Sequence, residues 1–349
     1  MIYRRLGNSG IKIPAMTFGT ATFGGVGEFF KAWGNIQLQE AKELIAVCLE
    51  NGANAFDTAD CYSNGKAEEI LGELIKERRK EIFLSTKTGM ILNDDKNNSG
   101  TSFSRIMQSC ENSLKRLQTD YIDLYYFHSF DALTPIEEML RAIEILIQQG
   151  KIRYFGVSNY SAWHLMKMLS ICKKYNLPKP VVHQAYYSLA ARELEWELLP
   201  LGIDQKVGTL VWSPLSGSML SGKISRHKAP PSDSRLSTNY TWGIDREKLF
   251  DIIDVCEEIA KETGYSIAQI ALAWLLTRPS ISGLIIGART KEQLIENFKA
   301  TQILLSCEHL EKLEKVSRVR PIYPYWHQQM TVPHRDPHCI DITTNLTNA

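Results

Sequence analysis

The stretch NAFDTADCYSNGKAEEILGELI, residues 54–75, carries the pattern that decides the fold. It begins as a short apolar strand, ends that strand at Asp57, and turns at Asn64-Gly65 into a segment whose apolar residues recur at helical spacing. A carboxylate at the end of a buried strand needs a cationic partner, because an unpaired buried charge is costly. No basic residue lies beside Asp57 in this stretch before Lys66. We therefore expect its partner to come from another part of the chain.

The same order of elements, a β-rich run followed by a polar break and an amphipathic helix, repeats along the chain. The predicted strands are AMTFGT (15–20), NAFDTA (54–59), IFLSTK (82–87), YIDLYYFH (121–128), IRYFGVSN (152–159), VVHQA (181–185), GTLVWS (208–213) and SGLIIGA (282–288). Mostly apolar strands that alternate with helices indicate a parallel sheet covered by helices. Eight such units favour an α/β fold of the closed (β/α)8 TIM barrel type over an open doubly wound sheet, and no strand is followed by GxGxxG.

Four segments lie outside this repeat. The opening MIYRRLGNSGIKIP predicts a small β-hairpin, turned at Asn8-Ser9-Gly10, that closes the floor of the barrel. Residues 213–245 form a long connection after strand seven, which is typical of a lid or binding loop. Residues 306–318 predict an accessory helix. We expect a single barrel domain over residues 1–319 and an irregular tail over residues 320–349.

The composition argues against several classes of partner. The chain has 349 residues and a formal net charge of +1, without a long run of one sign, so neither nucleic acid nor an anionic membrane surface is expected. No segment approaches the roughly 20 apolar residues of a membrane-spanning helix, and the start of the chain does not resemble a signal peptide. The seven scattered cysteines favour reduced thiols in the cytoplasm. The spacing of His327, His334 and His338 matches no metal-ligand pattern, so no metal is expected.

Four side chains with acid–base chemistry are predicted to meet at one end of the barrel. In this fold the carboxyl ends of the strands converge, and chemistry takes place there. Asp57 ends strand two, Tyr62 follows in the next loop, Lys87 ends strand three and His128 ends strand four. Lys87 is therefore the candidate partner of Asp57.

Such a set is suited to moving a proton to a carbonyl oxygen. Tyrosine ordinarily titrates near pH ~10. A cation about 4 Å away, at an effective dielectric constant of about 20, contributes roughly 4 kcal/mol, which is about three pH units as an upper figure. Lys87 is thus predicted to bring Tyr62 toward neutrality, while Asp57 keeps Lys87 charged and His128 donates a hydrogen bond to the substrate. Each residue alone is more often structural; their arrival at three consecutive strand ends strengthens the functional interpretation.

Several motifs in the same order resemble those of the aldo-keto reductase superfamily. They are DTADCYSNGKAEEILGELI (57–75), STKTG (85–89), DLYYFH (123–128), GVSN (156–159) and PLSGSMLSGK (214–223), and the resemblance extends over residues 2–318. It implies a (β/α)8 barrel that binds a nicotinamide cofactor without a Rossmann fold. By position it makes Asp57, Tyr62, Lys87 and His128 the catalytic tetrad, hereafter the tetrad. Tyr62 would be the proton donor in carbonyl reduction and the base in alcohol oxidation.

The same resemblance implies a path for the cofactor. Gly19, Thr20 and Phe23 would flank the nicotinamide beside Asp57, and Trp212 would stack on its ring. The residues expected to bind its carboxamide are Ser158, Asn159 and Gln184, whose short polar side chains suit an amide. Those expected around the pyrophosphate are Ser213, Leu215, Gly217, Met219 and Lys223.

The last predicted strand and helix, SGLIIGARTKEQLIENFKA (282–300), would hold the ribose phosphate. Arg289 near a helix N-terminus combines a fork of donors with the helix dipole. The other residues assigned to this end are Gly287, Thr290, Gln293 and Asn297. Many family members carry Lys-Ser in place of Gly287-Ala288 and Arg in place of Gln293. This departure weakens the assignment of NADPH and leaves NAD as an alternative, although NADPH is favoured.

On the substrate side, the predicted pocket walls are Phe23, Met90 and Phe130, extended by Phe29, Phe30 and Trp33. Aromatic walls around one polar corner suit a small apolar or aromatic aldehyde or ketone.

The leading hypothesis is thus an NADPH-dependent carbonyl reductase. Two alternatives are weighed. A Schiff-base aldolase would use Lys87 as a nucleophile, but a lysine held protonated by Asp57 does not attack carbonyls. A redox-sensing, cofactor-binding subunit with slow turnover is the second; β subunits of voltage-gated potassium channels share this barrel.

Overall fold

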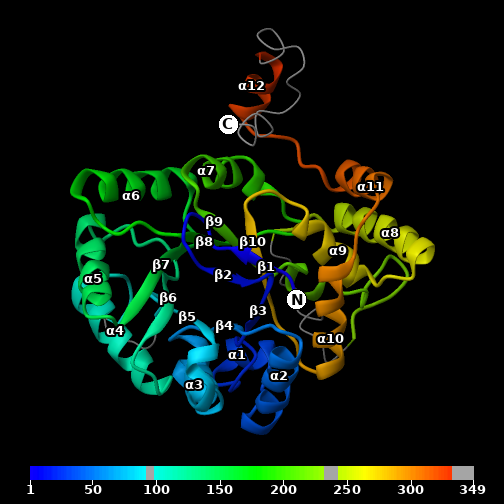
Figure 1. The fold of residues 1–349 in the computed structure, drawn as a ribbon. Coiled ribbons are helices and arrows are strands. Elements are labelled where there is room, and N and C mark those ends of the chain that lie inside the picture. Colours follow the sequence, from blue (N-terminus) through cyan, green and yellow to red (C-terminus); the bar gives the residue numbers. More distant parts are fainter. Residues whose placement is uncertain (92–97, 232–242, 332–349) are drawn as a thin grey trace.

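Eight parallel strands close into a barrel in a computed structural model that describes residues 1–91, 98–231 and 243–331 (Figure 1). The strand order around the barrel is β10-β3-β4-β5-β6-β7-β8-β9. The strands are β3 (Met16–Gly19), β4 (Ala55–Asp57), β5 (Phe83–Thr88), β6 (Ile122–Phe127), β7 (Ile152–Ser158), β8 (Val182–Tyr186), β9 (Gly208–Trp212) and β10 (Ile281–Ile286). Each overlaps one predicted run, so the predicted (β/α)8 barrel is confirmed.

Helices cover the outside of the barrel (Figure 1). They are α2 (Leu38–Glu50), α3 (Lys66–Ile75), α4 (Phe103–Arg116), α5 (Ile136–Gln148), α6 (Ala162–Tyr175), α7 (Leu198–Gln205), α8 (Arg246–Thr263), α9 (Ile267–Leu276) and α10 (Lys291–Lys299). Their apolar stripes face the strands: in α3, for example, Ile70, Leu71 and Ile75 are buried in the main core. Serine side chains cap the first turns of α4 and α6, at Ser102 and Ser161, so that these helices begin at defined positions.

A hairpin closes the amino end of the barrel, as predicted. Strands β1 (Tyr3–Arg5) and β2 (Lys12–Pro14) pair antiparallel. Leu6 and Ile13 are fully buried in a small core with residues of several barrel strands. Gly7 has a φ of 53°, and a Cβ there would overlap the carbonyl oxygen of Val181. Only glycine therefore lets the hairpin approach the barrel this closely.

The ends of the chain show one confirmation and one correction. The predicted accessory helix is α11 (Cys307–Ser317), which packs along α8 through the ion pair between Lys312 Nζ and Glu258 at 2.8 Å. The tail (320–349), expected to be irregular, contains helix α12 (Tyr325–Thr331) beyond α7 (Figure 1), and its residues 332–349 lie outside the described residues. The prolines at 321 and 324 pointed to irregular structure, but Pro324 immediately precedes the helix, where proline is tolerated.

Two loops at the carboxyl end of the barrel contain short helices. The chain between β3 and α2 forms α1 (Glu28–Trp33), none of whose residues is buried. The segment predicted as a long connection contains the 3-10 turn η4 (Ser216–Ser218) before α8, and its residues 232–242 lie outside the described residues. Among the described helices, none is both long and apolar enough to cross a membrane.

Candidate active site

The barrel brings the four tetrad residues together at the carboxyl ends of β4, β5 and β6. Asp57 is the last residue of β4, and Tyr62 begins the 3-10 turn η1 (Tyr62–Gly65) that follows. Lys87 is the penultimate residue of β5, and His128 follows directly after β6. The parallel register sets Asp57 opposite Ser85 and Lys87 opposite Tyr126, which places these strand ends at the same level.

Asp57 and Lys87 form a buried ion pair with complete hydrogen bonding. The side chains are 3% and 0% exposed, and Lys87 Nζ contacts Asp57 Oδ1 directly. The ammonium also donates to the carbonyl oxygen of Thr58 at 2.8 Å and to the Tyr62 hydroxyl at 3.3 Å. These three acceptors match its three protons. The predicted partner of Asp57 is therefore the one that the structure provides.

The other carboxylate oxygen of Asp57 is held by two neutral donors. Ser85 Oγ donates to Asp57 Oδ2 at 2.8 Å, and Gln184 Nε2 donates to the same oxygen at 3.0 Å. A buried ion pair is tolerable only when its remaining polar atoms are hydrogen-bonded. Ser85 from β5 and Gln184 from β8 meet that condition from two sides of the barrel.

The protonation of Lys87 and Tyr62 departs in part from the prediction. Burial acts to lower the pKa of Lys87, but the Asp57 carboxylate and the Tyr62 hydroxyl together outweigh it, so the pKa of Lys87 is raised and the ammonium stays charged. Burial raises the pKa of Tyr62 to about 12, although Lys87 acts in the opposite direction. The predicted shift of the Tyr62 pKa toward neutrality is therefore wrong, because the Coulomb estimate left out the desolvation of the phenolate.

His128 is a neutral imidazole beside Tyr62. Burial, and then the charge of Lys87, hold the pKa of His128 well below its ordinary value. Its ring centroid lies 5.8 Å from that of Tyr62 at an interplanar angle of 73°. Its Nδ1 lies 3.6 Å from Cys61 Sγ, and its carbonyl oxygen accepts a hydrogen bond from Asn159 Nδ2 at 2.9 Å. His128 is therefore positioned through both its side chain and its main chain.

Residues assigned to the nicotinamide lie around this centre. Asn159 Nδ2 also donates to Ser158 Oγ at 3.0 Å, and Trp212 Nε1 donates to Asn159 Oδ1 at 3.1 Å. One face of Trp212 stacks on Tyr186 with centroids 4.9 Å apart. These side chains, from the ends of β7, β8 and β9, form one network with the main chain of His128.

Three residues assigned to the nicotinamide come from β3 and the loop after it. The main chain and hydroxyl of Thr20 both donate to the carbonyl oxygen of Asp57, at 2.9 and 3.3 Å. A Cβ at Gly19 would lie 2.9 Å from Ile285 Cγ2, so a side chain there would crowd β10. Phe23 is fully buried against Phe18 in the core. Its side chain therefore does not form an open pocket wall, contrary to prediction, because the loop folds inward onto Ile36.

The loop after β9 turns tightly through several left-handed residues. Ser213, Ser216, Gly217 and Ser218 have φ values of 49°, 49°, 64° and 82°. Main-chain hydrogen bonds hold this turn: the Ser216 N–H donates to the carbonyl oxygen of Ser213 at 2.8 Å, and the Met219 N–H donates to that of Ser216 at 3.1 Å. The remaining predicted pyrophosphate ligands lie in the same loop: Leu215 is half-buried, Met219 is buried and Lys223 is half-buried. The residues predicted to contact the pyrophosphate thus lie together in one loop at the carboxyl end of the barrel.

At the far side of the mouth, Arg289 is exposed and contacts α1. Its guanidinium donates to the carbonyl oxygens of Ala32 and Trp33 at 3.1 Å each. Its main-chain N–H donates to Gln293 Oε1 at 3.0 Å, and Thr290 caps α10. Of the other residues assigned here, Gly287 is exposed and Asn297 is buried. The guanidinium is thus accessible at a helix N-terminus, as the predicted phosphate contact requires.

Some residues predicted to form the substrate pocket lie next to Tyr62, and others do not. Phe30 of α1 lies against Tyr62, with ring centroids 5.6 Å apart, and Phe29 packs on both Phe30 and Trp33. Met90 is exposed, while Phe130 stacks on His164 of α6 with centroids 3.5 Å apart. Phe30 is therefore the aromatic residue of this set that directly borders the tetrad.

Four residues that bear on the site were not singled out from the sequence: Ser85, Thr58, Cys61 and Tyr186. Ser85 stands two residues before Lys87 in the same strand, so the alternation of strand faces would have placed it on the same side. Cys61 immediately precedes Tyr62. The role of the Thr58 carbonyl oxygen and the stacking of Tyr186 depend on backbone geometry and packing that no sequence pattern encodes.

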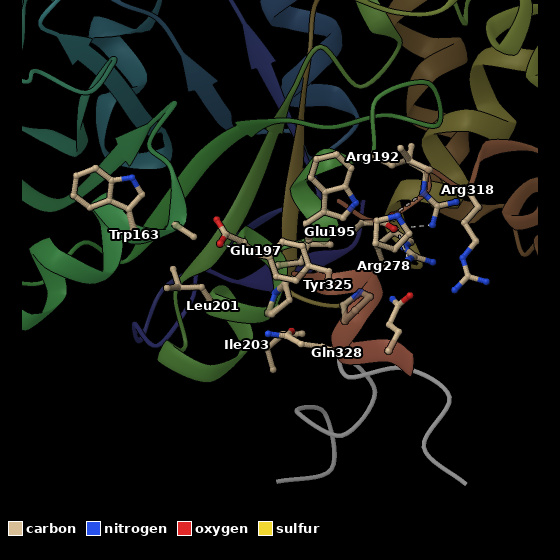
Figure 2. A pocket seen from close by; sticks show the side chains of 18 of the residues that line it. Trp163, Arg192, Glu195, Glu197, Leu201, Ile203, Arg278, Arg318, Tyr325 and Gln328 are labelled. Carbon is tan, nitrogen blue, oxygen red and sulfur yellow. Dashed lines mark hydrogen bonds and ion pairs between the residues drawn. The ribbon is translucent and has the colours of Figure 1, made fainter. Parts of the chain in front are cut away.

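A cavity of about 480 Å³ lies away from the tetrad, between α6, α7, α11 and the tail (Figure 2). Several of its polar residues pair with one another: Arg192 Nη2 contacts Glu195 at 2.7 Å and Glu314 at 2.8 Å, and the Tyr325 hydroxyl of α12 donates to Glu197. No tetrad residue lines it.

Within the described ranges no cluster of His, Cys, Asp and Glu could hold a metal ion; His334 and His338 lie outside those ranges.

The sequence comparisons agree with this geometry. The model of the Aldo/keto reductase family matches residues 15–318. The chain belongs to the aldo/keto reductase family. Members of this family are oxidoreductases that generally bind NAD(P)H, and an oxidoreductase activity in general is therefore supported.

Three relatives show what the chain is similar to. It is 37% identical to a "Probable voltage-gated potassium channel subunit beta" of Arabidopsis thaliana, over 93% of this chain and 99% of that protein. It is 35% identical to a "Putative voltage-gated potassium channel subunit beta" of Schizosaccharomyces pombe, over 92% and 94%. It is 34% identical to the "Uncharacterized oxidoreductase YrpG" of Bacillus subtilis, over 90% and 96%.

Replacing Ser85 should test how far the buried pair depends on its neutral donors. Ser85→Ala removes a hydrogen bond to a buried carboxylate, so we expect the free energy of unfolding to fall by about 1.5–3 kcal/mol in urea titrations. Ser109→Ala is the matched control, because the Ser109 hydroxyl is buried without a partner among the described residues. That change should be neutral or stabilising. Equal losses in the two variants would contradict the role of Ser85.

Proposed function

We propose that the protein is an NADPH-dependent oxidoreductase that reduces aldehydes or ketones to alcohols, with Tyr62 as the proton donor. The observation that supports this most directly is the position of the Lys87 ammonium, 3.3 Å from the Tyr62 hydroxyl and paired with buried Asp57. The nicotinamide, when bound, would supply the hydride. The side chains described above would then supply the proton and hold the carbonyl group.

Tyr62 is in the protonation state that a proton donor needs. Its pKa of about 12 keeps the phenol protonated at neutral pH. As the carbonyl oxygen gains negative charge, the proton passes to it from Tyr62, and the negative charge left on the phenolate lies beside Lys87. Because Lys87 is already in place and desolvated, it stabilises that charge without reorganisation. Lys87 therefore acts chiefly on the transition state.

His128 would orient the carbonyl group. A neutral imidazole with a ring N–H directed at the substrate donates a hydrogen bond without competing for the proton of Tyr62. Phe30 at the edge of the same corner supplies an apolar wall. This combination favours a small apolar or aromatic carbonyl compound as the substrate.

The proposed cofactor site follows the strand ends from β7 to β10. Ser158, Asn159 and Gln184 would meet the carboxamide, and Trp212 the ring. The main chain at residues 213–218, with Lys223, would hold the pyrophosphate. The choice of NADPH over NADH rests on Arg289, which offers a planar fork of donors at the start of α10.

The proposed partner and cellular compartment follow from the charge distribution and the cysteines of the chain. We infer a small carbonyl compound as the partner, with no nucleic acid or membrane surface involved, since charges of both signs are spread over the chain. The cysteines within the described residues are all free, which suits the reducing cytoplasm.

A second candidate function is a redox-sensing subunit that binds the same cofactor and turns over slowly. It is favoured by the printed names of two relatives, which are channel β subunits. The tetrad supports the same chemistry in both cases. A Schiff-base aldolase is disfavoured, because the raised pKa of Lys87 leaves no free amine for attack on a carbonyl.

Tyr62→Phe should abolish most of the chemistry while keeping the site. We expect carbonyl reduction to fall by about 10²–10⁴-fold, the usual contribution of a positioned proton donor, with NADPH affinity nearly unchanged. Steady-state kinetics and fluorescence titration of NADPH would measure the two effects. Tyr125→Phe is the control, because it removes a fully buried phenolic hydroxyl of β6 that belongs to neither the tetrad nor the proposed cofactor site. Retention of most activity in Tyr62→Phe would exclude Tyr62 as the donor.

Arg289→Ala should separate the two cofactors. Loss of a charged hydrogen bond to the 2′-phosphate is expected to weaken NADPH binding about tenfold or more and to leave NADH binding nearly unchanged. Lys291→Ala is the control, since Lys291 is at the same helix start but pairs with Glu43 at 3.0 Å. The Kd of each cofactor for each variant gives the result. An equal loss of both cofactors in Arg289→Ala would refute the phosphate contact.

Turnover across a panel of small aldehydes and ketones should distinguish the reductase from the slow redox subunit. For a reductase we expect at least one substrate with a steady-state rate in the ordinary range of about 1–10³ s⁻¹. The rate of cofactor exchange, measured by displacement of bound NADPH, supplies the reference. Multiple-turnover rates that stay far below this range for every substrate, limited by cofactor exchange, would support the second function.

A further inference from the structure

The residue before the catalytic tyrosine touches the catalytic histidine. Cys61 is buried, and its Sγ lies 3.6 Å from His128 Nδ1. We propose that Cys61 is a positioning residue, whose thiol donates a hydrogen bond to Nδ1 and so keeps the imidazole proton on Nε2. This inference deepens the proposed function, on which its catalytic consequence rests.

The protonation of both groups sets the direction of this hydrogen bond. Burial raises the pKa of Cys61 to about 12, so the thiol carries its proton. His128 is neutral, because burial and Lys87 disfavour the imidazolium. One of its nitrogens is then a donor and the other an acceptor. Sulfur is a weak acceptor, whereas a neutral imidazole nitrogen is a good one, so the thiol donates and Nδ1 accepts.

The consequence appears at the other ring nitrogen. With Nδ1 as acceptor, the proton resides on Nε2, which makes no hydrogen bond to any residue that the structure describes. Nε2–H is therefore available to a substrate carbonyl oxygen. In the opposite tautomer a lone pair would face that oxygen, and the hydrogen bond would be replaced by repulsion. Cys61 thus decides whether His128 attracts or repels the carbonyl group.

Two restraints act on His128 together. Asn159 holds its carbonyl oxygen, and Cys61 holds its ring. Cys61 and Tyr62 are adjacent in the chain, so the same short turn positions the proton donor and the tautomer of the histidine beside it. The competing explanation is that Cys61 only fills space. Substitutions of Cys61 by a smaller and by a larger side chain, both without a hydrogen-bond donor, distinguish the two explanations.

The tautomer can be measured without any substrate. In full-length protein labelled with ¹⁵N-histidine, the two-bond and three-bond ¹H–¹⁵N correlations of each ring identify the protonated nitrogen, and His128→Gln assigns the signal. We expect His128 in the wild type to be neutral near pH 7 and to carry its proton on Nε2. A proton on Nδ1, directed at the sulfur, would overturn the proposal.

Variants at position 61 test the donor itself. Cys61→Val enlarges the side chain and Cys61→Ala reduces it; both lack a donor, so both should show a mixture of tautomers. Both should lower kcat/KM for carbonyl reduction by about three- to tenfold, the range expected for one neutral hydrogen bond. The Kd of NADPH should not change. Cys61→Ser keeps an O–H donor at a slightly longer distance, and we expect partial recovery of both readouts.

The outcomes separate this inference from the proposed function. Cys110→Ala is the control for loss of a buried thiol, because Cys110 is equally buried on α4, and it should leave the His128 signals unchanged. If the valine and alanine variants keep a pure Nε2–H tautomer, Cys61 does not set it and the proposal fails. If the wild type reduces no carbonyl compound, the proposed function fails, while the tautomer measurement still tests the role of Cys61.

Discussion

The buried ion pair of Asp57 and Lys87 constrains the rest of this active site. Moving two charges out of water costs several kcal/mol per ion, and their mutual attraction compensates only if the remaining polar atoms are also bonded. Here Ser85, Gln184 and the carbonyl oxygen of Thr58 complete the set. These groups come from β5, from β8 and from the residue that follows β4, so the pair is tolerable only when the barrel is closed and in register. The fold and the chemistry of the site are therefore linked through one interaction.

The same burial explains the protonation states around the pair. Desolvation favours the neutral form of Tyr62 and of His128, whereas Lys87 keeps its charge because Asp57 lies against it. A phenol that is protonated at rest beside a fixed cation is arranged to lose its proton only when an acceptor oxygen gains negative charge nearby. Catalysis of this kind depends on charge stabilisation in the transition state rather than on a resting phenolate.

Sequence patterns predicted the elements that follow periodic rules. Eight apolar strands separated by amphipathic helices predicted the barrel. The rule that the carboxyl ends of the strands converge predicted that the tetrad residues would meet. The pKa of Tyr62 was mispredicted because a pairwise Coulomb estimate contains the Lys87 charge but not the water lost from the phenol. Phe23 was misplaced because its loop turns the ring inward onto Phe18, which depends on tertiary packing. Helix α12 was missed because a seven-residue segment flanked by prolines has too little periodicity to identify.

The two candidate functions would use the same tetrad, so we expect the difference between them to lie in the loops that would admit and release the cofactor. Arg289 illustrates this point. Its guanidinium bonds the last carbonyl oxygens of α1, and Phe30 of α1 lies against Tyr62. The helix beside the catalytic tyrosine is thereby connected to the residue that we assign to the ribose phosphate. A phosphate is a stronger acceptor than a carbonyl oxygen because it is charged, so cofactor binding at Arg289 would compete directly with these contacts. We therefore expect the exchange rate of the cofactor, and with it the choice between a reductase and a slow redox subunit, to depend more on α1 and the loop after β9 than on the tetrad.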